Sequence, residues 1–201
     1  NLNYDANENW DLSVGVDARM YTGDHFRQVN DLLGLNGWVD NFRTDRPDDY
    51  TFTEEFEADP WSALFNSADE DNRTQYDYSV NINYIGAFGQ AEYEKDNLTA
   101  FVQASVSQQS FQRQDYFVYT NSDPLQNSDK KSLMGGNFKA GANYNFNDNH
   151  NAFVNAGYYS KQPFLTAVFP NNLNVVNTNL TNEKVLGFEA GYGFRNAKLN
   201  K

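Results

Sequence analysis

Side-chain parity in the segment 183–194, EKVLGFEAGYGF, constrains the fold of this chain more than any other sequence feature. Its even positions after Lys184 are apolar or aromatic, whereas its odd positions are glycine and glutamate apart from Val185. Successive side chains of a β-strand point to opposite faces of the sheet, so this parity predicts a strand with one apolar face. Soluble sandwiches and membrane barrels both contain such strands, and the function depends on whether the apolar face meets a second sheet or lipid.

The same alternation recurs along the chain, and two classes of connection separate its segments. We predict strands over 10–21, 78–94, 98–112, 138–146, 152–158 and 183–194, with a partial strand at the start and another from about Ala197. Short turns are expected at 5–9, 95–97, 147–151 and 195–197, and long loops at 22–77, 113–131 and 160–182. Alternate connections of an up-and-down antiparallel sheet lie at the same end. Short periplasmic turns opposite long extracellular loops are typical of outer-membrane barrels, whereas sandwiches have no reason to sort their connections this way.

The composition of the two predicted faces also favours lipid. The apolar face carries no charged residue, whereas the opposite face carries Asp11, Asp17, Arg19, Glu92, Glu94, Lys139 and Glu189. A third of the apolar positions are alanine: Ala18, Ala87, Ala91, Ala100, Ala104, Ala140, Ala142, Ala152, Ala156 and Ala190. A sandwich core must be filled by large interdigitating side chains, whereas lipid tails fill any gap beside a small one.

Large rings stand where the predicted strands meet the short turns, namely at Trp10, Tyr93, Tyr144, Phe146, Tyr192 and Phe194. This placement matches the aromatic girdle at a membrane interface, although aromatic residues are also common in strands generally. One strand is irregular, because its apolar parity changes between Tyr84 and Ile85. Either a β-bulge near Tyr84 or a strand whose upper part has left the membrane would explain that change.

Charge and cysteine content exclude several functions. The chain has a net charge of −12, which disfavours nucleic-acid binding because phosphate contacts require clustered Lys and Arg. It has no cysteine and two histidines far apart in sequence, His25 and His150, and it contains no phosphate-cradling glycine motif. No catalytic triad can be assembled from these residues. We therefore expect no enzymatic activity, no catalytic residue, no cofactor, no metal and no nucleic-acid partner.

The predicted loops hold the candidate contact residues. Ten of the 12 net negative charges lie in 22–77, where the spacing of Phe26, Val29, Leu32 and Leu33 predicts a short helix between Asp24 and Gly34. The part 45–61 suits a solvated acidic loop, a divalent-cation site without EF-hand spacing, or contact with a partner or substrate. Rings could supply flat surfaces for a sugar or macrocycle, and the candidates are Tyr50, Phe52, Phe56, Trp61, Phe164 and Phe169. The last two lie in an Asn-rich loop that could line a carbohydrate path or form an ordered lid.

Four segments together resemble the barrel domain of TonB-dependent outer-membrane receptors: YTGDHFRQVNDLLG (21–34), YIGAFGQAEYEKDNLTAFVQASVSQQSF (84–111), NAFVNAGYYSKQPF (151–164) and TNEKVLGFEAGYGFRNAKLN (181–200). The resemblance implies an all-β, antiparallel transmembrane barrel of roughly 22 strands with a plugged lumen. Residues 1–201 would supply about seven or eight long strands of that single domain, without the plug. It also implies residence in the bacterial outer membrane among its lipids, and TonB-energised import of a scarce bulky nutrient such as an oligosaccharide or siderophore. TonB and the plug domain are the implied partners.

Two other functions fit the alternation. A closed barrel of about eight strands could act as an anchor, adhesin or pore, with its lumen packed by side chains. A soluble β-sandwich could bind carbohydrate. Seven glycines on the face opposite the apolar one favour a roomy or plugged interior: Gly15, Gly86, Gly141, Gly157, Gly187, Gly191 and Gly193. Because both ends of the sequence alternate, we expect it to be a piece of a larger polypeptide.

Overall fold

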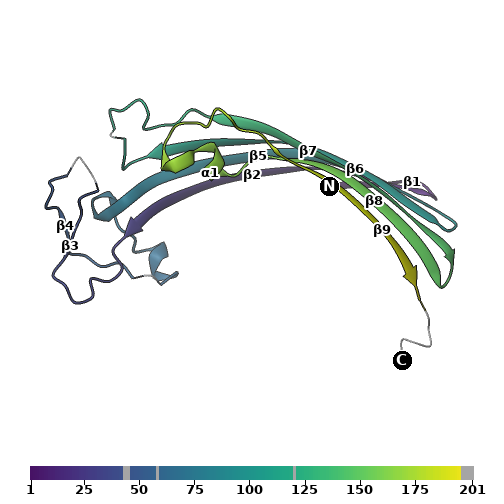
Figure 1. Ribbon diagram of the computed structural model, residues 1–201, viewed down its shortest axis with the longest axis horizontal. Coiled ribbons are helices and arrows are strands. Elements are labelled where there is room, and N and C mark those ends of the chain that lie inside the picture. Colours follow the sequence, from purple (N-terminus) through teal and green to yellow (C-terminus); the bar gives the residue numbers. More distant parts are fainter. Residues whose placement is uncertain (43–45, 58, 120, 196–201) are drawn as a thin grey trace.

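One curved antiparallel sheet of seven strands dominates the computed structural model, which describes residues 1–42, 46–57, 59–119 and 121–195 (Figure 1). The strands lie in the order β1-β2-β5-β6-β7-β8-β9, so each large strand pairs with its neighbour in the meander. Their bounds are β1 Leu2–Asn7, β2 Trp10–Gln28, β5 Arg73–Lys95, β6 Leu98–Asp115, β7 Lys131–Asn147, β8 His150–Lys161 and β9 Glu183–Phe194. The smaller elements are β3 Trp38–Val39, β4 Thr51–Phe52, the helix α1 Leu165–Val168, and the 3-10 turns η1 Ser62–Leu64, η2 Glu70–Asn72 and η3 Pro170–Asn172. The partial strand expected from Ala197 lies outside the described residues.

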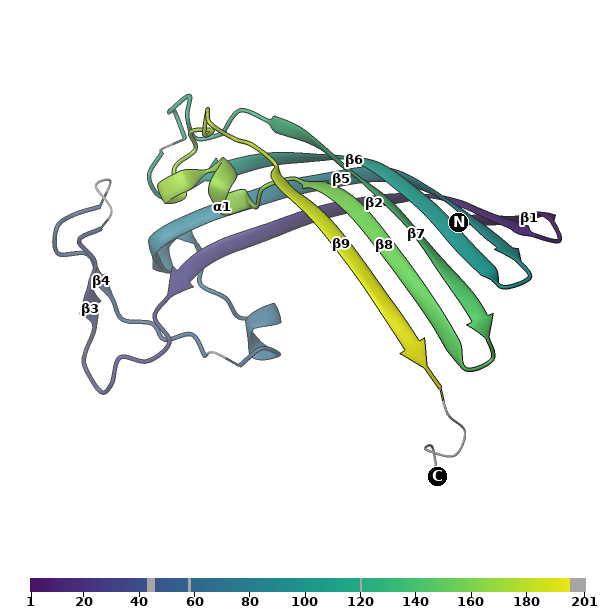
Figure 2. The ribbon, with the colours of Figure 1, turned by 45° about the vertical axis from the view of Figure 1, so that its right-hand side comes forward.

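The predicted sorting of the connections is confirmed. Two-residue turns join β1 to β2, β5 to β6, and β7 to β8, and they gather at one end of the sheet, the turn end (Figures 1 and 2). The long connections 29–72, 116–130 and 162–182 gather at the other end, the loop end. We call them the first, second and third loops. The first is shorter than its predicted range of 22–77, because β2 and β5 remain paired as far as Gln28 and Arg73.

The strand register divides the residues into two faces, as the alternation predicts. The outer face carries Val14, Ala87, Val102, Ala142 and Phe188, and the inner face carries Asp17, Glu92, Lys139 and Glu189. Val14 is 51% exposed and Phe188 76%, so no second sheet covers the outer face in the described residues. The sandwich alternative is therefore wrong. The edge strands β1 and β9 do not pair with each other, so the seven strands form an open segment of barrel wall.

The rings predicted near the turns lie on the outer face at the turn end. Trp10 and Tyr93 are partners in the β2–β5 register, with ring centroids 5.0 Å apart. Tyr144 and Phe146 follow on β7 at 5.4 Å. They border the apolar band at the position expected of a membrane-interface girdle. No helix in the described ranges is long and apolar enough to cross a membrane.

The parity change in β5 does not come from a bulge. Residues 78–95 pair without a register shift with β6, and 77–93 do so with β2, so the predicted bulge near Tyr84 is wrong. From Asn83 toward the loop end the outer face of β5 is polar, and Thr22 donates a hydrogen bond to Asn81 there. This polarity is what the other explanation, a strand whose upper part has left the membrane, predicts. The apolar side chains Val80 and Ile82 lie instead on the inner face, where Val80 is fully buried. The upper part of β5 therefore stands above the apolar band.

The helix predicted between Asp24 and Gly34 is also wrong. Residues 24–28 continue β2 and pair with 73–79 of β5, so cross-strand bonding prevails over the local helical spacing. Phe26 lies beneath the Arg73 guanidinium, 4.1 Å from the ring centroid to the Arg carbon. The chain then turns with positive φ angles at Leu33 (56°) and Gly34 (81°).

Candidate functional site at the loop end and on the inner wall

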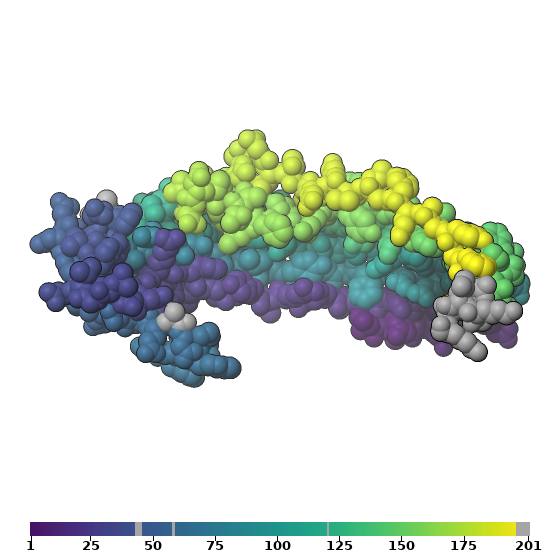
Figure 3. All heavy atoms as spheres, turned by 60° about the horizontal axis from the view of Figure 1, so that its bottom comes forward, coloured from purple at the N-terminus to yellow at the C-terminus, as the bar shows by residue number. Residues whose placement is uncertain are grey.

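The third loop folds back over the inner face and is held there by a small hydrophobic cluster. Phe111 of β6, Val168 of α1 and Phe169 are all at most 3% exposed and pack together. Partly buried side chains from β5, β7 and the loop itself surround them: Ile82, Leu133, Leu165, Val176 and Leu180. Figure 3 shows this segment, in yellow-green, lying across the strands. Burying three large side chains contributes several kcal/mol, on the order of 1.5–3 each, so the loop is a fixed part of the wall.

Arg113 joins the second and third loops to the sheet. Its side chain is buried, forms an ion pair with Asp115 at 3.1 Å, and donates a hydrogen bond to the carbonyl of Asn172 in the third loop. Its backbone N–H donates to the Ser128 hydroxyl in the second loop at 2.8 Å. Buried Asn174 adds a second tie, because its amide donates to the carbonyls of Leu125 and Gln126.

Burial shifts the pKa values of Arg113 and Tyr78, which lie near the loop end, above the apolar band. Burial lowers the pKa of Arg113, and the neighbouring Asp115 carboxylate acts in the opposite direction. The Arg113 guanidinium carbon lies 3.9 Å from the ring centroid of Tyr78. Burial raises the pKa of the Tyr78 phenol, and the charge of Arg113 partly offsets that rise. Burial therefore favours the neutral form of Tyr78, and it opposes the charge of Arg113, which the Asp115 carboxylate supports.

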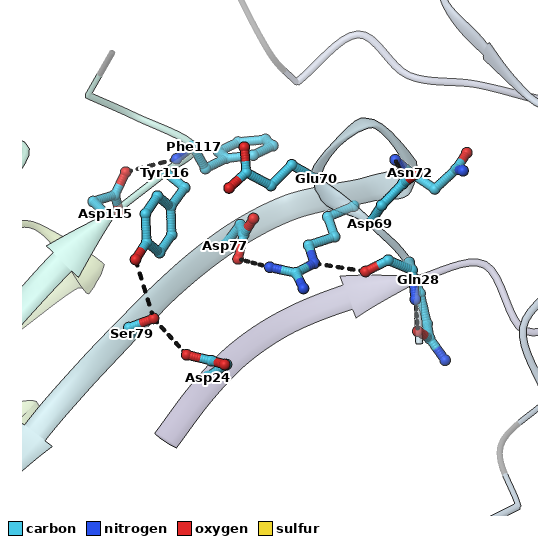
Figure 4. A network of polar contacts seen from close by, with 12 residues as sticks. Asp24, Gln28, Asp69, Glu70, Asn72, Asp77, Ser79, Asp115, Tyr116 and Phe117 are labelled. Carbon is cyan, nitrogen blue, oxygen red and sulfur yellow. Dashed lines mark hydrogen bonds and ion pairs between the residues drawn. The ribbon is translucent and has the colours of Figure 1, made fainter. Parts of the chain in front are cut away.

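A second polar network, drawn in Figure 4, joins the first loop to β2 and β5. Arg73 donates from Nε to the carbonyl of Ala68 at 2.9 Å and forms an ion pair with Asp77 at 2.9 Å. Ser79 bridges Asp24 of β2 and the hydroxyl of Tyr116 at the start of the second loop. These contacts tie the bases of the first and second loops together, so the loop end is a connected structure.

The structure separates the predicted contact residues into exposed and buried ones. Trp61 and Phe164 are 77% and 69% exposed, and both rings are accessible to a ligand. Phe52 is stacked on Trp38 with centroids 5.7 Å apart, Phe56 is buried, and Phe169 belongs to the cluster described above. Tyr50 is half-buried; its hydroxyl donates to the Asp71 carbonyl, and its ring lies under Arg46 at 4.4 Å. The six residues do not converge on one site, and their contact with a substrate stays a prediction.

A cavity of about 500 Å³ lies on the inner wall next to the base of the third loop. Its wall comes from β5 to β9, and its side chains are mainly tyrosine, serine and amides: Tyr84, Ser105, Ser107, Asn137, Tyr159 and Gln162, with Lys161, Glu183 and Val185 at one side. Asn137 donates to the Ser105 hydroxyl at 2.6 Å, and Gln162 donates to the Ser107 hydroxyl at 2.9 Å. The cavity thus presents neutral hydrogen-bonding groups between two aromatic rings.

The sequence did not indicate this cavity, because its candidate contact residues all lie in loops and its inner face was expected to line a roomy or plugged lumen. One sequence pattern could have indicated it: a tyrosine and a glycine two residues apart, both at positions that face the inner side of the sheet. Tyr84 precedes Gly86 in β5, and Tyr159 follows Gly157 in β8. Which strands lie next to each other decides whether such pairs share a site.

In the described residues, no group of three or more His, Asp or Glu side chains is placed to hold a metal ion. Some carboxylates of 45–61 already accept hydrogen bonds from other groups. Glu54 accepts a hydrogen bond from the Asn72 amide, and Glu55 accepts one from the backbone N–H of Leu32.

One comparison with known proteins identifies a family. No curated protein and no solved structure matches the chain. A family model described as "TonB dependent receptor-like, beta-barrel" matches residues 1–200, in agreement with the resemblance of the four segments. The sorted connections, the apolar outer face and the polar inner face are the features expected of such a barrel wall. This chain belongs to the β-barrel family of TonB-dependent receptors.

Proposed function

We propose that this chain forms part of the wall of a bacterial outer-membrane receptor that imports a scarce, bulky nutrient with energy supplied through TonB. The observation that carries the proposal is the asymmetry of the wall. All ten alanines of β2 and of β5 to β9 lie on the outer face with Val14 and Phe188, whereas Asp17, Lys139 and Glu189 lie on the inner face. Such a wall faces lipid on one side and a wet or plugged lumen on the other.

The loop end supports a role in capture from outside the cell. Three long loops gather there, two of them tied by Arg113 and Asn174, and Trp61 and Phe164 present exposed rings. In this proposal a plug domain fills the lumen, and TonB acts on that plug from the periplasmic side. The chain itself binds and guides a ligand and carries out no chemical conversion.

Uptake by cells tests the proposal. A strain lacking the full-length receptor is compared with the same strain complemented by the wild-type gene, in backgrounds with and without functional TonB. We expect complementation to restore growth on the limiting nutrient only when TonB is functional, with the nutrient recovered unmodified after incubation with purified receptor. Restored growth without TonB would instead support the pore alternative, and a converted nutrient would contradict the absence of catalysis.

A further inference from the structure

We propose that the inner-wall cavity between Tyr84 and Tyr159 binds a neutral, multiply hydroxylated ligand of the glycan class. This inference rests on the proposed function, because it names the class of nutrient that the receptor would capture. The volume of the cavity, about 500 Å³, lies within the range of small-ligand pockets.

The hydrogen-bonding groups of the cavity are neutral and act both as donors and as acceptors. The side-chain amide N–H groups of Asn137 and Gln162 donate hydrogen bonds to the hydroxyls of Ser105 and Ser107. In the part of the chain that the structure describes, no hydrogen bond engages the side-chain oxygens of these two amides. Tyrosine hydroxyls add groups that can donate or accept. Sugar hydroxyls need such mixed partners, because each of them also donates and accepts.

Two glycines leave room for the hydroxyl ends of the two tyrosine rings to lie close to the wall. A Cβ added at Gly157 would lie 2.7 Å from the Tyr159 hydroxyl oxygen, and one added at Gly86 would lie 2.8 Å from that of Tyr84. Both separations are shorter than any ordinary carbon–oxygen contact, so a side chain at either glycine would displace the ring. Aromatic rings suit the apolar C–H face of a pyranose, which stacks on aromatic surfaces.

The charges near the cavity balance one another. Lys161 and Glu183 are register partners across β8 and β9, and the Lys161 ammonium lies 4.5 Å from the ring centroid of Phe164. Arg19 of β2, the register partner of Tyr84, already forms an ion pair with Asp17. An anionic ligand would call for a cluster of unpaired Arg or Lys, and a cationic ligand for unpaired carboxylates. Within the described lining there is one residue of each sign, which favours an uncharged ligand.

Binding to the purified full-length receptor in detergent tests the ligand class. The probes are hexasaccharides of matched size: neutral hexamers of glucose, mannose, galactose and xylose, anionic hexagalacturonate, and cationic chitosan hexaose, with ferric citrate as an iron chelate. Titration calorimetry is expected to detect binding of at least one neutral hexamer and weaker or no binding of the charged probes. Binding of charged probes alone, or of none of the probes, would overturn the inference.

Substitutions test the site. Tyr159→Ala and Tyr84→Ala are each expected to weaken binding of the neutral hexamer by about tenfold or more, as for an aromatic anchor, whereas Tyr159→Phe keeps most of the affinity. Tyr158→Ala is the matched control, because Tyr158 is the adjacent tyrosine and lies on the outer face. Equal effects at positions 158 and 159 would place binding elsewhere.

A glycine pair gives a second test that leaves the tyrosines intact. Gly157→Ala is expected to weaken binding by displacing the Tyr159 ring. Gly187→Ala should leave binding unchanged, because Gly187 is the register partner of Gly157 and a Cβ there meets no described atom within 4 Å. Unaltered binding in Gly157→Ala would contradict the role of the Tyr159 ring position.

Uptake assays separate this inference from the proposed function. If growth depends on the receptor and on TonB but no neutral hexamer binds, the receptor function stands and the glycan class is wrong. If a neutral hexamer binds through Tyr159 but uptake does not require TonB, the site stands and the energised transport is wrong.

Discussion

Tyr158 and Tyr159 are neighbours in β8 that serve opposite faces of the sheet. Tyr158 is paired between Phe138 and Leu186 on the outer face, whereas Tyr159 is paired between Asn137 and Val185 at the inner-wall cavity. The same residue type therefore contributes to the lipid boundary at one position and to a candidate binding wall at the next. Matched substitutions on the two faces can test each role.

A charge on the outer face should destabilise the barrel. In the full-length receptor folded into lipid vesicles, Val14→Arg is expected to lower the free energy of unfolding by about 2–4 kcal/mol, because Val14 lies in the middle of the apolar band of β2. Ser13→Arg, on the inner face, is the control and should have a much smaller effect. Denaturant unfolding measures both, and equal losses would mean that the two faces do not differ in their surroundings.

Removing Arg113 should loosen the second and third loops together. Arg113→Met leaves the buried Asp115 carboxylate without its cation, and breaking a buried pair costs about 3–5 kcal/mol. We expect faster limited proteolysis within both 116–130 and 162–182. Arg19→Met removes the exposed pair with Asp17 and should change neither rate. Cleavage of one loop alone would show that Arg113 does not link them.

Alkaline pH should weaken the loop end through Tyr78. The folded pKa of this phenol is raised by burial, so its contribution to stability is complete below the unfolded pKa of about 10 and is lost as pH rises through the folded pKa. Amide hydrogen exchange, corrected for its intrinsic pH dependence, is expected to show loss of protection in 113–119 above about pH 10. Tyr78→Phe should lessen that loss. A wild-type response identical to that of the variant would assign the effect to another group.

Two phenylalanines of the third loop should respond differently to truncation. Phe169→Ala removes a side chain from the hydrophobic cluster and is expected to cost about 3–5 kcal/mol of local stability, measured by proteolysis of 162–182. Phe164→Ala removes an exposed ring and should leave proteolysis nearly unchanged. If Phe164 contacts the substrate, as the sequence predicts, its truncation weakens uptake without loosening the loop.

The strands were predictable from sequence because the lipid-facing positions are uniformly apolar and the turns are short. Val14, Ala142 and Phe188 all lie on the face that parity assigns to them. The sequence-based predictions were wrong where a strand extends past the apolar band. Phe26 and Val29 have helical spacing, yet pairing with β5 continues to Gln28, and a local pattern contains no information about a distant partner.

The candidate site was less predictable than the fold. Ring-rich loops favoured Phe52, Phe56 and Phe169 as contact residues, but these rings are buried against the protein. Sequence identifies aromatic residues without showing whether another side chain already covers them. The inner-wall cavity combines residues from five strands, so it emerges only when the register is known.

The continuous pairing of β5 through Tyr84 and Ile85 makes this strand intolerant of a change in length. Its lower part is apolar on one side and its upper part is apolar on the other, and both parts share a single ladder. One extra residue inserted at that junction would reverse the half beyond it, exposing Val80 and Ile82 to water while turning Asn81 and Asn83 toward the covered side. Homologues should therefore vary freely in the lengths of their loops but conserve the number of residues between the tight turn and the point where β5 emerges from the bilayer.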